Sequence, residues 1–388
     1  MTTFARRQFL AACGALPLAA QQSAQQSAPP AARPTSWNQV FFHDTDDQQL
    51  SILELAFYSN RAAMGIAALS NRGNVKPASL RTIDSGRNWD LHPLKPAAFS
   101  LQFLDEANGW MAADNGIYKS SDAGQNWQRV LRNSKIRHVR FVDYQRGYAA
   151  GEECTVLETA DGGKNWKPIE AASSYKTNKD LTAYTWIEFA SPTLGFIIGH
   201  YSPPPPYRVQ ELPAWMDPTA ASKRRMTPSL SLVLQTIDGG KVWKPTSSSI
   251  FGHISRFSIN HRGVGLGLIE FDDSFDYASE VYLINLVTGK TDRIFREAER
   301  AITDVFVRKD GSFLLAGVES PGRLRTSPLP SKVHILQGNI VGKWTEMEVD
   351  YRATARRVRL SESPAGEMFA CTDTGMILRL EPPAAPKT

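Results

Sequence analysis

Polar side chains recur in the middle of a repeated apolar–x–apolar pattern in this 388-residue chain. Arginines gathered around one cavity could bind an anionic group, because low-dielectric walls focus their field. The alternative is that the arginines pair with the acidic groups and need no ligand. We favour the interpretation that these charged side chains pair with one another. If the segments line a central channel that binds a ligand, its candidate binding residues are Gln102, Arg140, Glu188, Arg256 and Arg359. Six segments of the chain carry this apolar–x–apolar pattern. Their middle residues are Gln102, Arg140, Glu188, Ser258, Phe306 and Arg359.

A second candidate surface is the proline-rich stretch at 203–228, which holds Pro203–Pro206, Trp215 and the basic run Lys223, Arg224 and Arg225. Proline stiffens a segment, and Trp and Arg are enriched at binding hot spots. A tolerated surface insertion accounts for the stretch equally well.

An acidic loop near residue 270 does not predict a metal site. Glu270, Asp272, Asp273 and Asp276 lack the spacing of a calcium loop. We therefore expect neither a metal nor a cofactor.

Four similar turns give the architecture that positions these residues. The segments are TIDSGRNW (82–89), SSDAGQNW (120–127), TADGGKNW (159–166) and TIDGGKVW (236–243). Their aspartates, Asp84, Asp122, Asp161 and Asp238, lie 38, 39 and 77 residues apart, the last gap holding the proline-rich insertion. A period near 40 residues with short strands is typical of a propeller blade.

Each turn is expected to fix a hairpin between the third and fourth strands of a blade. The Asp accepts backbone N–H groups, the Gly takes positive φ, and the Trp covers the sheet. The residues with this structural role are Asp84, Gly86, Trp89, Asp122, Gly124, Trp127, Asp161, Gly163, Trp166, Asp238, Gly240 and Trp243.

The sequence predicts an all-β, seven-bladed β-propeller with four-stranded blades. The seventh unit ends after its third strand, and SWNQV (36–40) is similar to NWQRV (126–130), a fourth strand. The N-terminal strand should therefore close the ring and remove an open edge. Long connections between second and third strands, at 71–78, 202–228, 270–278 and 320–331, should lie on the face away from the four turns.

The N-terminus has the layout of a secretory signal peptide. Arg6 and Arg7 precede a short apolar run, which resembles a twin-arginine signal. We expect a signal peptide at 1–20, a disordered linker at 21–36, the propeller at 37–382 and a tail at 383–388. The protein should be exported to the periplasm or beyond. The alternative of a lipoprotein anchored at Cys13 is disfavoured by the short apolar run before it.

The composition argues against a nucleic-acid partner. The net charge is only +5, and 44 basic residues stand against 39 acidic ones without a long basic run. We expect a monomer.

The four turns resemble the Asp-box, or BNR, repeat, although Asn88, Asn126, Asn165 and Val242 replace its usual Thr. The unit also carries a Gly–aromatic pair at Gly109-Trp110, Gly147-Tyr148 and Gly195-Phe196. Together these motifs, across 37–380, resemble the propellers of the photosystem II assembly and stability factors. That resemblance implies an exported, non-enzymatic protein that holds a membrane-complex subunit during assembly for photosynthesis.

The leading hypothesis is therefore a non-catalytic scaffold that binds a protein partner. The alternative is a glycan-binding protein or a sialidase-like glycoside hydrolase, because sialidases also use Asp-box propellers. Arg140, Arg256 and Arg359 could form the arginine triad of that family, but its Arg-Ile-Pro sequence is absent.

Overall fold

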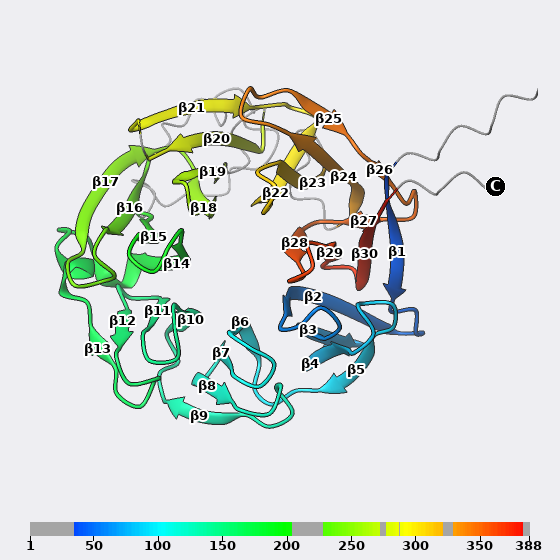
Figure 1. Cartoon of the computed structure of the whole chain (residues 1–388), viewed down its shortest axis with the longest axis horizontal. Helices are drawn as coiled ribbons and strands as arrows, with labels where there is room; N and C mark the ends of the chain where they lie inside the picture. The colour runs from blue at the N-terminus through cyan, green and yellow to red at the C-terminus, as the bar shows by residue number, and fades with distance from the viewer. Residues whose placement is uncertain (1–34, 204–227, 272–276, 287, 321–328, 383–388) are drawn as a thin grey trace, which may run out of the picture.

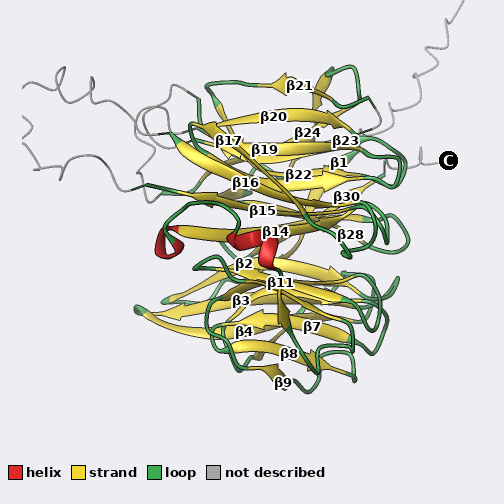
Figure 2. Cartoon of the chain, turned by 90° about the vertical axis from the view of Figure 1, so that its left-hand side faces the viewer, coloured by secondary structure: helices red, strands yellow, loops and turns green. Residues whose placement is uncertain are grey.

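Thirty strands form seven sheets around one axis in the computed structural model, which describes residues 35–203, 228–271, 277–286, 288–320 and 329–382 (Figure 1). In the side view the strands run between the two faces of the ring, and loops join them at both faces (Figure 2). The prediction of a seven-bladed propeller is confirmed. No helix in the described ranges is long and apolar enough to cross a membrane.

Within a blade the strands are antiparallel and follow one another in chain order from the axis outward. Blade 1 consists of β2 (Gln48–Phe57), β3 (Ala63–Asn71), β4 (Asn74–Thr82) and β5 (Asp90–Pro93). Blade 2 consists of β6 (Ala98–Phe103), β7 (Gly109–Ala113), β8 (Gly116–Ser120) and β9 (Gln128–Leu131). Blade 3 consists of β10 (Ile136–Phe141), β11 (Gly147–Gly151), β12 (Val156–Thr159) and β13 (Lys167–Pro168). Blade 4 consists of β14 (Thr182–Phe189), β15 (Gly195–Tyr201), β16 (Ser229–Thr236) and β17 (Lys244–Ile250).

The remaining blades follow the same order. Blade 5 consists of β18 (His253–Ile259), β19 (Val264–Glu270), β20 (Ser279–Asn285) and β21 (Lys290–Phe295). Blade 6 consists of β22 (Arg300–Val307), β23 (Phe313–Glu319), β24 (Ser331–Gly338) and β25 (Trp344–Glu346). Blade 7 consists of β28 (Val358–Glu362), β29 (Met368–Thr372), β30 (Met376–Glu381) and β1 (Ser36–Phe42). The additional elements are β26 (Glu348–Val349), β27 (Thr354–Ala355) and the 3₁₀ turns η1 (Glu170–Ser173) and η2 (Lys179–Leu181).

The N-terminal strand closes the ring, as the sequence predicted. β1 pairs antiparallel with β30, so that Trp37 lies opposite Leu380, and β26 pairs in parallel with the other edge of β1. Trp37 is fully buried in the core between blades 6 and 7. The last blade thus joins the first and last segments of the chain.

The core consists of seven apolar clusters, and each lies between two neighbouring blades. This arrangement follows from the strands, whose apolar side chains point to both faces of every blade. The cluster between blades 4 and 5 is the smallest and has only three buried members, Ala190, Phe196 and Ile259. Fully buried apolar packing is therefore thinnest at that interface.

The four repeated turns share one hydrogen-bond pattern, seen clearly at Asp161. Asn165 donates its backbone N–H to one carboxylate oxygen of Asp161 at 2.9 Å and its side-chain amide to the other at 2.7 Å. Thr159 donates its hydroxyl to Asp161 and accepts the N–H of Gly163. Val242 cannot make the side-chain contact in the fourth turn, where only its N–H binds Asp238.

A steric contact explains why glycine stands before the aromatic residue in each Gly–aromatic pair. A Cβ on Gly109 would lie 2.5 Å from the ring of Phe103, and one on Gly195 would lie 2.3 Å from the ring of Phe189. In blade 2 the same Phe103 ring packs edge-on against Trp127 of the turn, with ring centroids 6.1 Å apart. Because only glycine leaves room for this ring, the pair recurs at the start of the second strand.

The predicted connection at 71–78 is wrong. β3 and β4 continue to a tight turn at Arg72 and Gly73, both with positive φ, and Asn71 pairs with Asn74. Most of the 202–228 insertion lies outside the described residues, as do Trp215, Lys223, Arg224, Arg225 and the signal peptide at 1–20.

Side chains of the innermost strands bind the backbone of the next blade. Gln102 accepts the N–H of Phe141 at 2.6 Å and donates to its carbonyl oxygen at 2.8 Å. Comparable bonds join six of the seven interfaces in the described structure: Glu54–Leu101, Ser100–Val139, Trp186–Phe257, Ser258–Val307, Thr303–Val358, Asp304–Leu360 and Ser361–Leu55. The exception is the interface between blades 3 and 4.

Replacing Asp161 should change how stability depends on pH. Hydrogen bonds from the backbone and side chain of Asn165 lower the pKa of Asp161 from 3.8 to about 2. The folded state therefore binds this proton more weakly than the unfolded state, and the contribution of the carboxylate is lost between about pH 4 and about pH 2. We expect the difference in unfolding free energy between the wild type and Asp161→Asn to shrink over this range in urea titrations.

The exposed Asp90 on β5 lies outside the turn and provides the control, so Asp90→Asn should be about as stable as the wild type. A difference for Asp161→Asn that stays constant down to about pH 2 would show that the carboxylate does not stabilise the turn by its charge.

Replacing Gln102 should weaken the join between blades 2 and 3. In Gln102→Leu, the buried N–H and C=O of Phe141 lose their partner, at a cost of about 2–6 kcal/mol for the two groups. Chemical denaturation measures this loss, and Gln128→Leu on the exposed strand β9 is the matched control. An unchanged stability would mean that the bridge contributes nothing.

Candidate functional site

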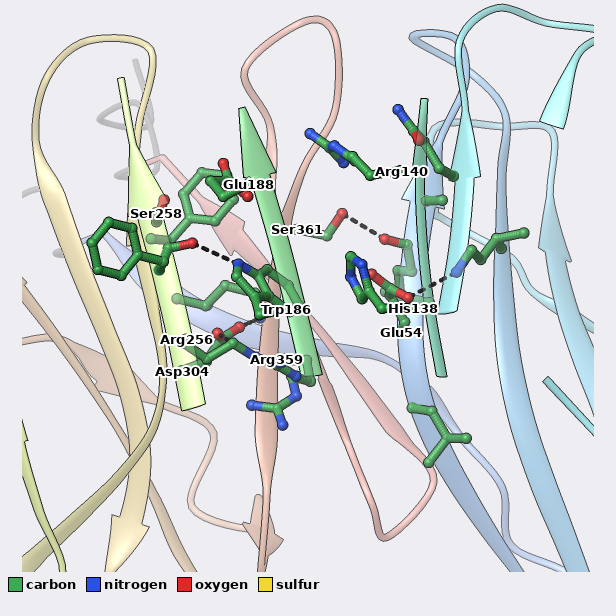
Figure 3. A pocket seen from close by; sticks show the side chains of 18 of the residues that line it. Glu54, His138, Arg140, Trp186, Glu188, Arg256, Ser258, Asp304, Arg359 and Ser361 are labelled. Carbon is green, nitrogen blue, oxygen red and sulfur yellow. Dashed lines mark hydrogen bonds and ion pairs between the residues drawn. The ribbon is translucent and has the colours of Figure 1, made fainter. Parts of the chain in front are cut away.

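The innermost strands enclose a cavity of about 390 Å³ on the axis of the ring (Figure 3). All seven blades contribute to its wall, through β2, β6, β10, β14, β18, β22 and β28. A volume of this size suits a small ligand. The cavity collects all five channel residues that the sequence indicated, namely Gln102, Arg140, Glu188, Arg256 and Arg359.

Strand register sorts the side chains that face the axis into two levels. The upper level lies nearer the four repeated turns and consists of Ala56, Gln102, Arg140, Glu188, Ser258, Phe306 and Ser361. The lower level lies two residues earlier on each strand and consists of Glu54, Ser100, His138, Trp186, Arg256, Asp304 and Arg359. Arg140 and Glu188 appear above His138 and Trp186 in Figure 3.

The sequence alignment of Arg359 with Gln102 is wrong by two residues. Ser361 pairs with Phe369 as Gln102 pairs with Trp110, so Ser361 occupies the upper level and Arg359 the lower. A shift of two leaves an alternating pattern almost unchanged. In blade 7 the final apolar position is taken by Glu362, which hid the true register.

In the lower level, the side chain of Arg256 lies over an aromatic ring and next to a carboxylate. The guanidinium of Arg256 lies 4.2 Å from the ring centroid of Trp186, and its Nε is 3.5 Å from Oδ1 of Asp304. The Trp186 indole N–H donates to the carbonyl of Phe257 at 3.0 Å. Burial and the nearby Arg359 lower the pKa of Arg256 to about 10, so the side chain stays charged at neutral pH.

Two of the acidic groups in the channel are bound to backbone. Glu54 accepts the N–H of Leu101 at 3.0 Å, and Asp304 accepts the N–H of Leu360 at 2.7 Å. Burial raises the pKa of Glu54, although Leu101 and the arginines Arg256, Arg140 and Arg359 oppose the shift. Arg359 donates to the carbonyl oxygen of Thr303.

The side chains of Arg140, Glu188 and His138 line the cavity without a hydrogen bond or ion pair to any described residue, and the buried hydroxyl of Thr185 on the same wall also has none. Burial raises the pKa of Glu188 to about 7, against the opposing charges of Arg140 and Arg256. Burial, with the same two arginines, lowers the pKa of His138 to about 3, so its ring is neutral at pH 7. The ring lies 4.7 Å from that of Trp186.

The lower opening of the channel carries exposed groups at the β-bulges of three successive blades. Leu53 and Phe99 are each 38% exposed, and the Arg137 guanidinium lies 4.6 Å from the Phe99 ring centroid. Arg137 also pairs with Glu152 at 3.0 Å. We call Leu53, Phe99 and Arg137 the rim patch.

Sequence reasoning missed the rim patch and most of the lower level. The bulges insert one residue into each first strand of blades 1 to 6, so alternation breaks where these residues begin. The alternation of polar and apolar residues does continue toward the N-terminus in His138-Val139-Arg140. This could have indicated His138 as a further residue that faces the channel. Among the described residues, no group of three or more His, Cys, Asp or Glu side chains could hold a metal ion.

No known family model and no curated protein matches the chain. Among solved structures, the chain is similar to YCF48 from Cyanidioschyzon merolae, with a TM-score of 0.56, 15% identity, and coverage of 89% of this chain and 98% of that one. It is also similar to a structure of YCF48 bound to D1 peptide, with a TM-score of 0.55, 13% identity, and coverage of 90% and 99%. A third similar structure is the extracellular domain of a putative one-component system from B. thetaiotaomicron, at a TM-score of 0.53 and 8% identity, covering 88% of this chain and 39% of that one. At these identities the likeness shows a shared propeller fold.

Proposed function

We propose that this chain is an exported, non-catalytic propeller scaffold that binds a protein partner, such as a subunit of a membrane complex. The observation that carries the proposal is the fold match, over about nine-tenths of this chain and nearly all of the other, to YCF48 bound to D1 peptide. Rigid scaffolds with exposed loops at their faces commonly serve this role.

The chemistry of the channel supports binding rather than catalysis. Glycoside hydrolysis requires two positioned carboxyl groups, but Glu54 and Asp304 each hold a backbone N–H of the next blade. Glu188 is the channel carboxyl group without a partner in the described structure. A sialidase-like enzyme would also use a tyrosine nucleophile, and no tyrosine is among the described residues that line the cavity.

The glycan alternative keeps one observation in its favour. Arg140, Arg256 and Arg359 all lie close enough to Glu54 to lower its proton affinity, so the three arginines do share one cavity.

We propose the rim patch as the surface that binds the protein partner. It combines two partly exposed apolar side chains with an arginine held over an aromatic ring, a composition enriched at binding hot spots. The basic insertion at 203–228, predicted from sequence as a binding surface, stays a prediction.

Capture experiments test the proposal. The chain from Gln21 onward is immobilised and exposed to a periplasmic extract, and the double variant Phe99→Ala/Arg137→Ala is compared with the wild type. Because truncating hot-spot residues costs about 2 kcal/mol or more each, we expect recovery of the partner to fall by at least about tenfold.

The matched control is Phe42→Ala/Arg129→Ala, which changes an exposed Phe and an exposed Arg on outer strands. It should capture the partner as the wild type does, and a 203–228 deletion tests the insertion separately. Equal recovery by all variants would exclude both surfaces. Hydrolysis of a glycoside that disappears in Arg140→Met would replace the proposal with the enzymatic alternative.

A further inference from the structure

We infer that the central channel holds a binding site for the carboxylate of a small organic acid, with Arg140 of the upper level as its main ligand. The inference does not rest on the partner-binding proposal, because its main ligand, Arg140, is not part of the rim patch at the lower opening.

The first step concerns the interface between blades 3 and 4, which differs from the other six. At six interfaces of the described structure, an inner-strand side chain binds the backbone of the next blade. At the interface between blades 3 and 4, His138 and Arg140 occupy the same strand positions but form no such bond. Their polar atoms are therefore not used to hold the ring together.

The second step is the burial of these free groups. His138 is only 8% exposed, and its Nδ1 is buried without a hydrogen-bond partner. Arg140 is half-buried on the same strand and faces the same cavity. Because buried polar groups are nearly always hydrogen-bonded in native proteins, the unpartnered Nδ1 of His138, two residues from Arg140 on the cavity wall, indicates a ligand.

The third step is charge. Four arginines line the cavity, and two of them have acidic partners, Arg137 in Glu152 and Arg256 in Asp304. Glu54, Glu188 and Glu362 also line it, and burial raises the pKa of Glu362. The carboxyl groups of Glu54 and Glu188 have raised pKa values, the latter about 7, so neither carries its full charge as readily as an exposed glutamate. Because these carboxyl groups ionise less readily, the wall favours an anion, and a guanidinium forms a bidentate pair with a planar carboxylate.

The fourth step is the size and composition of the cavity. Its volume of about 390 Å³ far exceeds that of a single inorganic ion, and Phe306, Trp186 and Phe257 supply apolar walls. Ser258, whose oxygen accepts the N–H of Val307, keeps its hydroxyl hydrogen available on the same level. These features suit a carboxylate attached to an apolar or aromatic body.

Titration calorimetry with benzoate tests the site on the purified chain. At about pH 6 we expect one benzoate per chain, and at least tenfold weaker binding for Arg140→Met. Arg129→Met, an exposed arginine on β9, is the matched control and should bind as the wild type does. Phosphate should bind more weakly than benzoate.

The pH dependence supplies an independent readout. Glu188 on β14 faces Arg140 and His138 on β10, Arg256 on β18 and Asp304 on β22, and its pKa is about 7. As the pH rises through 7, Glu188 gains a negative charge, so benzoate affinity should fall several-fold between pH 6 and pH 8. Glu188→Gln keeps the side-chain shape without the titration, and its affinity should stay level.

Three outcomes would overturn the inference. They are no benzoate binding by the wild type, equal binding by the wild type and a folded Arg140→Met, and the same fall with pH in Glu188→Gln as in the wild type. If Arg140→Met does not fold, the Glu188→Gln comparison decides alone. Failed partner capture leaves these results unaffected, so the two proposals fail separately.

Discussion

The ring depends on backbone hydrogen bonding between neighbouring strands, because a strand edge without a partner is both unstable and prone to association. The pairing of β1 with β30 satisfies that constraint at the one place where the chain could have left blade 7 with three strands. β26 then covers part of the outer edge of β1. Closure fixes the innermost strands around a single axis, and this alone brings residues from Glu54 to Arg359 into one cavity.

The side chains that face this axis divide into two groups with different roles. Most of them, such as Gln102 and Asp304, use their polar atoms to join one blade to the next. Between blades 4 and 5, where the buried apolar cluster is smallest, Trp186 binds the backbone of Phe257 and its ring lies against Arg256. Those that do not join blades, Arg140, His138 and Glu188, are the ones left to interact with a ligand.

The sequence predicted the blades well because each turn is a local device. Asp161, Gly163 and Trp166 act within a few residues of one another, so four copies in register reveal the repeat and the fold. The channel was harder to predict, because its levels depend on register across blades and on the inserted residue of each bulge. Arg359 was misplaced for the first reason, and Phe99 and Arg137 were missed for the second.

Native-state hydrogen exchange of the inner-strand amides tests this account most directly. The amides of Val139, Phe141, Val307 and Leu360 have side-chain acceptors on the preceding blade. If these bonds hold the ring, the four amides should exchange as slowly as those within the blade ladders, through global unfolding. Fast exchange of these four amides, beside slow exchange of the ladder amides, would contradict the division of the channel side chains into joining and ligand-facing groups.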